Sequence, residues 1–100
     1  MKTGVRYCAL FVDNKMIARA CIEKLTNLYW EISDVRVAKD RRNRGYATAI
    51  CVFVTNEIIK NGRIPTIRTE KTNTAMLKVI EKLQFQPFNE EENRYAKHIR

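Results

Sequence analysis

The chain has 100 residues, 45% of them hydrophobic, which is enough for one core of the size found in small domains. Its net charge of +8 favours partners that carry phosphate, without selecting among such partners. No apolar stretch is long enough to cross a bilayer and residues 1–13 lack a signal-peptide pattern, so a membrane protein is excluded and one cytoplasmic domain over residues 1–100 is predicted.

The chain begins with segments typical of three strands. Residues 6–12 and 16–23 are apolar runs separated by Asp13-Asn14-Lys15, which is hairpin-turn chemistry. Residues 28–37 then alternate in character, which is typical of a third strand. The alternation predicts one face made of Tyr29, Glu31, Ser33, Val35 and Val37 and an opposite face made of Trp30, Ile32, Asp34 and Arg36.

From Tyr46 the apolar period becomes helical. The residues that recur at helical spacing are Ala47, Ile50, Val54 and Ile58. Asn61-Gly62 is typical of a helix stop, so the first helix is predicted to end there.

The remaining segments predict a strand, a helix and two further strands. Residues 64–69 form the strand, with Pro65 expected at its start or on an unpaired edge. Thr72 or Asn73 can cap a helix whose apolar face is Met76, Leu77, Ile80 and Leu83. Residues 84–88 and 95–99 are strand candidates around an acidic turn at 89–93. The order β-β-β-α-β-α-β-β predicts an α/β fold with a mixed sheet flanked by helices.

The cysteines and the histidine carry no metal signature. Cys8, Cys21 and Cys51 lie in apolar segments without the close pairing of a metal or redox motif, so we predict buried free thiols. His98 has no second histidine or nearby cysteine to complete a ligand set. No metal cofactor is therefore predicted.

The junction between the third strand and the first helix is the candidate binding site. After Val37, a loop leads to Gly45 at the mouth of the helix, where unpaired backbone N–H groups and the positive end of the helix dipole favour an anion. Gly45 allows close approach of the backbone, and Arg41, Arg42 and Arg44 add positive charge. The pattern predicts a phosphate site that is neither a Walker loop nor a dinucleotide fingerprint.

Two motifs in this region resemble those of the GNAT acetyltransferase superfamily. The stretch VRVAKDRRNRGYATAI resembles the acyl-CoA-binding motif, in which a hydrophobic strand precedes Q/R-x-x-G-x-G/A, here residues 42–47. Downstream, GRIPTIRTEKTNTAMLKVIEKLQF resembles the later strand and helix of that family. The resemblance covers roughly residues 29–88 and implies a GNAT-like fold, without the N-terminal helical segment that walls the acceptor site in larger members.

The resemblance also implies a cofactor, acetyl-CoA, and roles for individual residues. The backbone of Val35 and Val37 would bind the pantetheine arm, for which packing in the core is the alternative role. Asn73 would contact the cofactor, and a helix N-cap is an equally good reading of it. The pyrophosphate would be held by the backbone amides of Arg42, Asn43, Arg44, Gly45, Tyr46 and Ala47, although Tyr46 and Ala47 could instead serve only helix packing.

Glu31 is the candidate catalytic residue. Acetyl transfer to an amine needs a deprotonated nitrogen, and a carboxylate beside the cleft can take that proton directly or through water. In the histone-acetyltransferase branch of the family, a glutamate lies at the same distance before the motif glycine as Glu31 lies before Gly45, and the resemblance therefore implies the same role. The alternative is that Glu31 is an ordinary exposed strand residue. The backbone N–H of Val35 would donate to the oxyanion. Where many members carry a tyrosine that protonates the leaving thiolate, this chain has Ile80.

Three functions follow, in this order of preference. The first is an N-acetyltransferase acting on a primary amine, either a small molecule or a protein or peptide lysine or N-terminus. An open acceptor face would suit a peptide, or a site completed by a second subunit in a homodimer. The second is a non-catalytic acyl-CoA-binding sensor. The third, a nucleic-acid binder, explains the charge but not the motif spacing, and the aromatic platform expected of it is missing.

Overall fold

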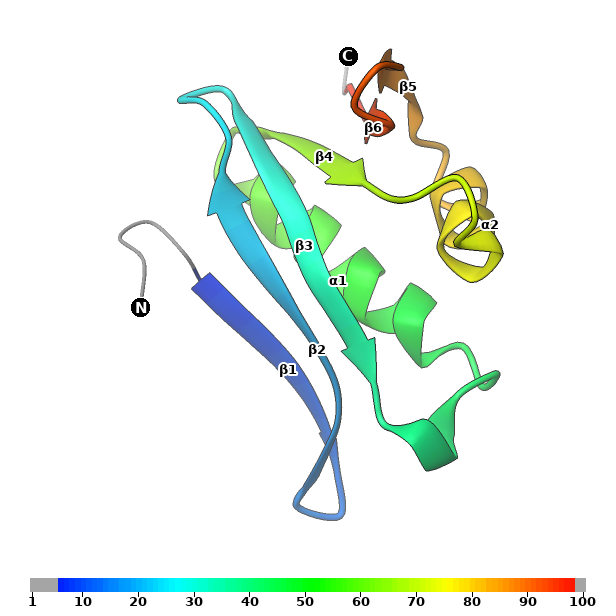
Figure 1. Ribbon diagram of the computed structural model, residues 1–100. Coiled ribbons are helices and arrows are strands. Elements are labelled where there is room, and N and C mark those ends of the chain that lie inside the picture. Colours follow the sequence, from blue (N-terminus) through cyan, green and yellow to red (C-terminus); the bar gives the residue numbers. More distant parts are fainter. Residues whose placement is uncertain (1–5, 99–100) are drawn as a thin grey trace.

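Six strands and two α-helices follow one another in the predicted order (Figure 1). The structure is a computed structural model that describes residues 6–98. Its elements are β1 (Arg6–Val12), β2 (Lys15–Lys24), β3 (Tyr29–Val37), the short 3-10 helix η1 (Lys39–Arg41), α1 (Tyr46–Lys60), β4 (Ile64–Arg68), α2 (Thr74–Lys82), β5 (Gln86–Asn89) and β6 (Arg94–Ala96). The predicted α/β class is confirmed, and η1 is an addition within the predicted loop.

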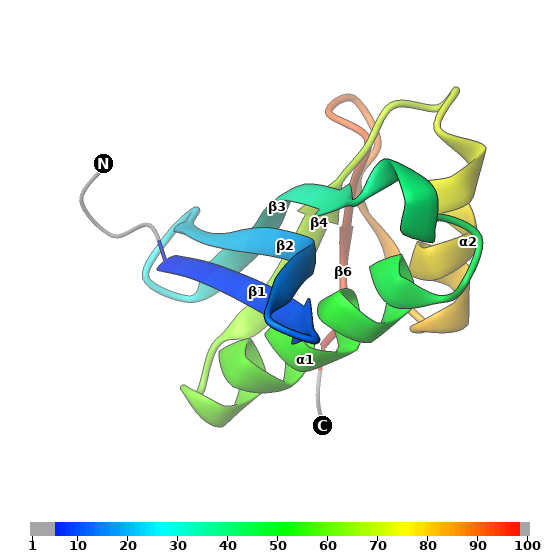
Figure 2. The ribbon, with the colours of Figure 1, turned by 90° about the horizontal axis from the view of Figure 1, so that it is seen from below.

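The strands form a single mixed sheet in the order β1-β2-β3-β4-β6-β5. β3 and β4 are parallel, and the other neighbouring pairs are antiparallel. The parallel pair is joined through α1, which lies along one face of the sheet (Figure 2). Since antiparallel strands continue on both sides of this pair, β3 and β4 meet in the middle of the sheet.

The hairpin between β1 and β2 has the predicted turn. Asp13 and Asn14 both adopt left-handed backbone conformations, with φ of 51° and 64°. A two-residue turn of this kind matches the twist of the flanking strands, and Asp and Asn tolerate the conformation better than other non-glycine residues. The hairpin prediction is therefore confirmed.

A bulge interrupts β3 at Asp34. Ser33 pairs with Cys21 and Arg36 pairs with Arg19, so two residues of β3 stand opposite one residue of β2. Asp34 takes up the extra residue with a φ of 50°. A bulge of this kind bends its strand and increases the local twist.

The bulge makes the predicted alternation of β3 wrong beyond Ser33. Val35 and Val37 pack against the core cluster that contains Trp30 and Ile32, which the alternation had placed on the opposite face. The inserted residue reverses which side chains point to which face, because the side-chain period of a strand is two. Glu31 therefore shares neither face nor surroundings with Val35.

The core lies between the sheet and the two helices. α1 buries Ile50, Val54 and Ile58 at the predicted spacing, and α2 adds Val79 and Ile80 to the same cluster. Pro65 is the second residue of β4, so it lies at the start of the strand, the first of its two expected places; the second, an unpaired edge, does not apply because β4 is interior. The backbone of β4 is still hydrogen-bonded at this position, because the Pro65 carbonyl accepts a hydrogen bond from the Lys97 N–H.

The three cysteines are free and buried, as predicted. Within residues 6–98, no group of three or more His, Cys, Asp or Glu side chains could hold a metal ion. Neither α-helix in this part of the chain has the length and apolar character needed to cross a membrane.

Candidate functional site

A groove opens where β3 and β4 diverge. The two strands pair only from Tyr29 to Ile32 on β3 and from Ile64 to Ile67 on β4, and they separate beyond these residues (Figure 1). The groove has a volume of about 990 Å³. Three segments line it, namely the end of β3 with the loop that follows, the first turn of α1, and α2. The groove therefore contains the junction between the third strand and the first helix, which the sequence indicated as the candidate binding site.

One wall of the groove is a free strand edge. The N–H of Ala38 donates to the Ile17 carbonyl on β2 at 2.8 Å. Successive N–H groups of a strand point to opposite edges, so the N–H groups of Val37 and Val35 point away from β2, into the gap that β4 leaves. Both residues line the groove. Such an edge can form hydrogen bonds with an extended amide-containing ligand.

The loop before α1 gathers backbone donors at one end of the groove. Asn43 and Gly45 adopt left-handed conformations, with φ of 63° and 83°, on either side of Arg44. The first turn of α1 leaves the N–H groups of Tyr46, Ala47 and Thr48 without helical partners, and within residues 6–98 no side chain caps that end. Alternating backbone conformations and a helix start form an anion-binding concavity.

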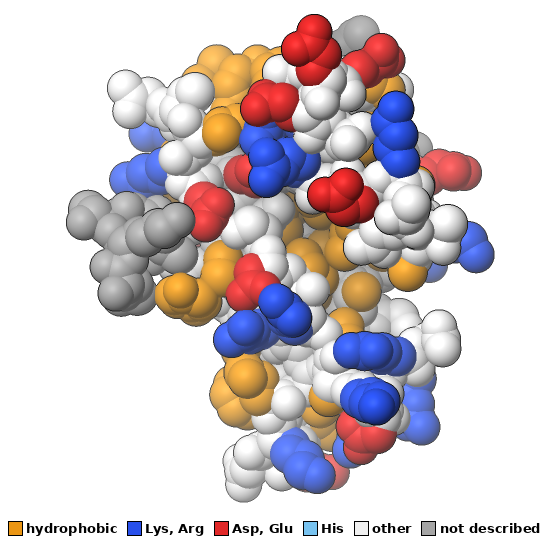
Figure 3. All heavy atoms as spheres, in the orientation of Figure 1, with side chains coloured by type: hydrophobic (Ala, Val, Ile, Leu, Met, Phe, Trp, Pro, Cys, Tyr) orange, Lys and Arg blue, Asp and Glu red, His pale blue; other side chains and the backbone are white. Residues whose placement is uncertain are grey.

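Basic side chains surround the groove. Arg36, Arg41 and Arg42 line it from the β3 side, and Asp34 is its sole acidic lining residue in the part of the chain that the structure describes. In Figure 3, Lys and Arg side chains gather around the lower part of this face, over the loop that leads to α1. Asp34 is itself paired with Arg36 at 2.8 Å, and this hydrogen bond lowers the pKa of the Asp34 carboxyl. The groove is thus suited to an anionic ligand.

Lys78 and Lys82 supply positive charge from the opposite wall. Both belong to α2 and line the groove. Sequence reasoning missed them because it considered only the apolar face of this helix. Their spacing of four residues, which places two side chains on one helix face, was the signal that could have identified them.

Asn73 performs the capping role considered for it. Its Oδ1 accepts a hydrogen bond from the Met76 N–H at 3.1 Å at the start of α2. Asn73 also lines the groove, so its predicted contact with a cofactor is compatible with the cap and stays a prediction.

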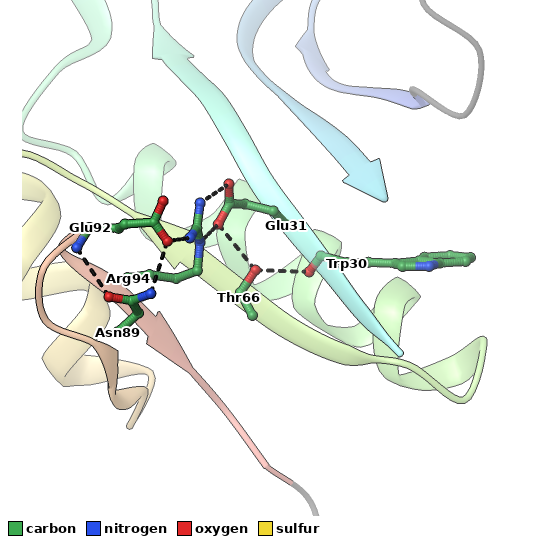
Figure 4. A network of polar contacts seen from close by, with 6 residues as sticks. All are labelled: Trp30, Glu31, Thr66, Asn89, Glu92 and Arg94. Atoms are coloured by element: carbon green, nitrogen blue, oxygen red, sulfur yellow. Dashed lines mark hydrogen bonds and ion pairs between the residues drawn. The ribbon is translucent and has the colours of Figure 1, made fainter. Parts of the chain in front are cut away.

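Glu31 lies outside the groove lining, in a buried ion pair (Figure 4). Only 7% of Glu31 is exposed, so the alternative of an exposed strand residue is wrong. Its Oε1 accepts hydrogen bonds from Arg94 Nε at 2.6 Å and from Thr66 Oγ1 at 3.2 Å. The Glu31 carboxylate raises the pKa of Arg94 above its usual value. The structure thus places Glu31 beside a cation that is 63 residues away in the sequence.

Ile80 faces the core. It is 3% exposed and belongs to the central cluster, whereas its neighbour Val79 also lines the groove. A side chain at position 80 therefore points away from the space where a leaving thiolate would lie.

Cys51 is expected to be inert in the folded protein. Burial raises the pKa of its thiol to about 12, from 9.0, so the reactive thiolate is about a thousandfold scarcer at neutral pH. Labelling with iodoacetamide at pH 8, followed by peptide mass spectrometry, should leave Cys51 unmodified in the native protein and modify it in urea. Rapid native labelling would contradict this assignment. The result matters because an enzyme thiol that carries the acyl group must ionise and be accessible.

Residues 11–95 match the model of a family described as FR47-like protein. No curated protein sequence matched the chain.

Solved structures share the fold at low sequence identity. A GNAT family acetyltransferase from Elizabethkingia anophelis with acetyl-CoA bound has a TM-score of 0.81 at 18% identity, covering 87% of this chain and 57% of that one. The ribosomal-protein-S18-alanine N-acetyltransferase from Escherichia coli has a TM-score of 0.75 at 18% identity, covering 96% and 67%. The PaiA N-acetyltransferase from Thermoplasma acidophilum in complex with coenzyme A has a TM-score of 0.77 at 11% identity, covering 93% and 58%. This chain thus spans 57% to 67% of the lengths of these proteins, with which it shares the fold.

Proposed function

Since this chain belongs to the FR47-like protein family, within the GNAT acetyltransferase superfamily, we propose that it transfers an acetyl group from acetyl-CoA to a primary amine. The observation that carries the proposal is the groove, which joins a free strand edge to an anion-binding helix start. The acceptor is a small-molecule amine or a lysine or N-terminus of a peptide or protein. We propose that residues 1–100 act as one domain, with acetyl-CoA as cosubstrate and without a metal.

The cofactor would lie along the groove with its phosphates at the start of α1. The backbone of Val35 and Val37 would bind the amides of the pantetheine arm, as a neighbouring strand would. The amides of residues 42–47 would surround the pyrophosphate, and Lys78 and Lys82 would add positive charge from α2. Asn73 would contact the cofactor from the start of the same helix. These roles are supported by the positions of the residues, since all of them except Arg44 line the groove.

The reaction requires removal of a proton from the acceptor. The amine nitrogen attacks the thioester carbonyl, the oxyanion takes a hydrogen bond from the Val35 N–H, and the carbon–sulfur bond breaks to release the coenzyme A thiolate. Glu31 accepts the proton that the nitrogen loses. Because Glu31 does not line the groove, the proton would reach it through water.

A non-catalytic acyl-CoA-binding sensor is the second candidate. Two observations favour it: Glu31 does not line the groove, and Ile80 occupies a core position. Incubation with acetyl-CoA and a panel of amines and lysine peptides, with thiol release and cofactor binding followed together, separates the candidates. Release would support the transferase, binding without release would support the sensor, and neither would contradict both.

Acetyl-CoA is expected to raise the melting temperature. A ligand that binds only the folded state stabilises it by about 2.7 kcal/mol at a concentration one hundred times its dissociation constant. Lys78→Glu combined with Lys82→Glu should reduce this shift, and added salt should reduce it in the wild type, because part of the attraction is electrostatic. Lys15→Glu, in the exposed hairpin away from the groove, is the control and should retain the full shift. Equal shifts in the wild type, the double lysine variant and Lys15→Glu would exclude the α2 lysines from the site.

A further inference from the structure

We propose that Arg94 is a positioning residue of this reaction, which holds the Glu31 carboxylate in one orientation where β3 and β4 begin to diverge. The inference rests on the proposed function, in which Glu31 accepts the proton from the amine. It concerns a residue of β6 that contacts neither the groove nor the cofactor loop.

Arg94 forms hydrogen bonds to the Glu31 carboxylate through two nitrogen atoms. Its Nε donates to Oε1 at 2.6 Å and its Nη2 donates to Oε2 at 3.4 Å (Figure 4). The side chains are 8% and 10% exposed, so water weakens the attraction little. A guanidinium bound to both carboxylate oxygens fixes the orientation as well as the charge of the carboxylate.

The other charged and polar groups around Glu31 explain why a cation is needed. From β2, the cross-strand partner of Glu31 is Glu23, a like charge. From β4, Thr66 contributes an uncharged hydroxyl at 3.2 Å. A buried carboxylate beside a like charge needs a cation that is hydrogen-bonded to it. Arg94 supplies that cation.

A second acid keeps Arg94 in place. Its Nη1 donates to Oε1 of Glu92 at 2.6 Å, and Glu92 is half exposed in the turn that joins β5 to β6. Asn89 Nδ2 in turn donates to the same Glu92 oxygen at 2.9 Å. The C-terminal hairpin therefore becomes part of the site through Arg94.

The kinetic test compares Arg94→Met and Arg94→Lys with Glu91→Gln, which removes an exposed acid of the same turn whose side chain forms no hydrogen bond or ion pair within residues 6–98. Arg94→Met should lower kcat by about tenfold or more, a part of what a general base contributes, and leave the KM for acetyl-CoA within about twofold. Arg94→Lys should restore part of the rate, and Glu91→Gln should stay near wild type.

The double variant distinguishes positioning from general support of the fold. In a Glu31→Gln background, Arg94→Met should have little further effect on kcat, because the group through which Arg94 acts is gone. An equal loss of kcat in both backgrounds would show that the arginine serves only the fold and would overturn the proposal.

An NMR measurement on Arg94 tests the same contact without an acceptor. The Arg94 Nε–H signal, assigned by its loss in Arg94→Lys, should exchange slowly with water in the wild type, where it is buried and donates to Glu31, and exchange faster in Glu31→Ala. Equal exchange rates in the two proteins would overturn the proposal. A wild type that binds acetyl-CoA and acetylates no amine would instead overturn the proposed function, whatever the exchange shows.

Discussion

Glu31→Gln is expected to reduce turnover by about a hundredfold to ten-thousandfold, the contribution of a general base, with the affinity for acetyl-CoA retained. Glutamine keeps the size of the side chain and an oxygen that can accept the bonds from Arg94 and Thr66, but it cannot take a proton near neutral pH. Initial rates of thiol release, together with calorimetric titration of acetyl-CoA, measure the two quantities separately.

The matched control is Glu23→Gln. Glu23 is the cross-strand neighbour of Glu31, so the same substitution removes a carboxylate from the same strand pair without removing the proposed base. Its turnover should stay near that of the wild type. The rate of Glu31→Gln should recover in part at high pH, where the amine is already deprotonated. Full activity of Glu31→Gln at neutral pH, with an unaltered pH profile, would remove Glu31 from the mechanism.

Gly45→Val is expected to abolish the stabilisation by acetyl-CoA. Gly45 has a φ of 83°, and within the described residues no heavy atom lies within 4 Å of where a Cβ would be, so the space above it is open to a ligand. A valine would occupy the place of the phosphate and would strain the backbone, at a cost of roughly 1–2 kcal/mol for a left-handed residue. The loss of the thermal shift and a fall in affinity of at least about tenfold follow from the blocked approach.

Gly62→Val is the control for strain alone. Gly62 stands just beyond the other end of α1, with a φ of 73° and equally open surroundings. Both variants should melt at lower temperature than the wild type, but Gly62→Val should keep its full response to acetyl-CoA. Binding by Gly45→Val that equals that of Gly62→Val would place the pyrophosphate elsewhere.

Local sequence was sufficient for features that depend on neighbouring residues. Asp13-Asn14 accepts left-handed conformations and so defined the hairpin, and the spacing of Ile50, Val54 and Ile58 defined the buried face of α1. The loop before Gly45 could be proposed as an anion site because its donors are consecutive backbone groups at a helix start. The element order followed from these local patterns.

The tertiary structure decided the features that join distant segments. The bulge at Asp34 reversed the faces of β3, because an extra residue fits only against a partner strand that residues 28–37 do not reveal. Arg94 meets Glu31 because β4 brings β6 close to β3, and no local pattern encodes a pairing across 63 residues. The sequence by itself thus determined the order of elements and indicated the candidate anion-binding loop, through propensity and spacing. The groove and the environment of Glu31 were decided only by the fold, since both depend on which strands are neighbours and where they separate.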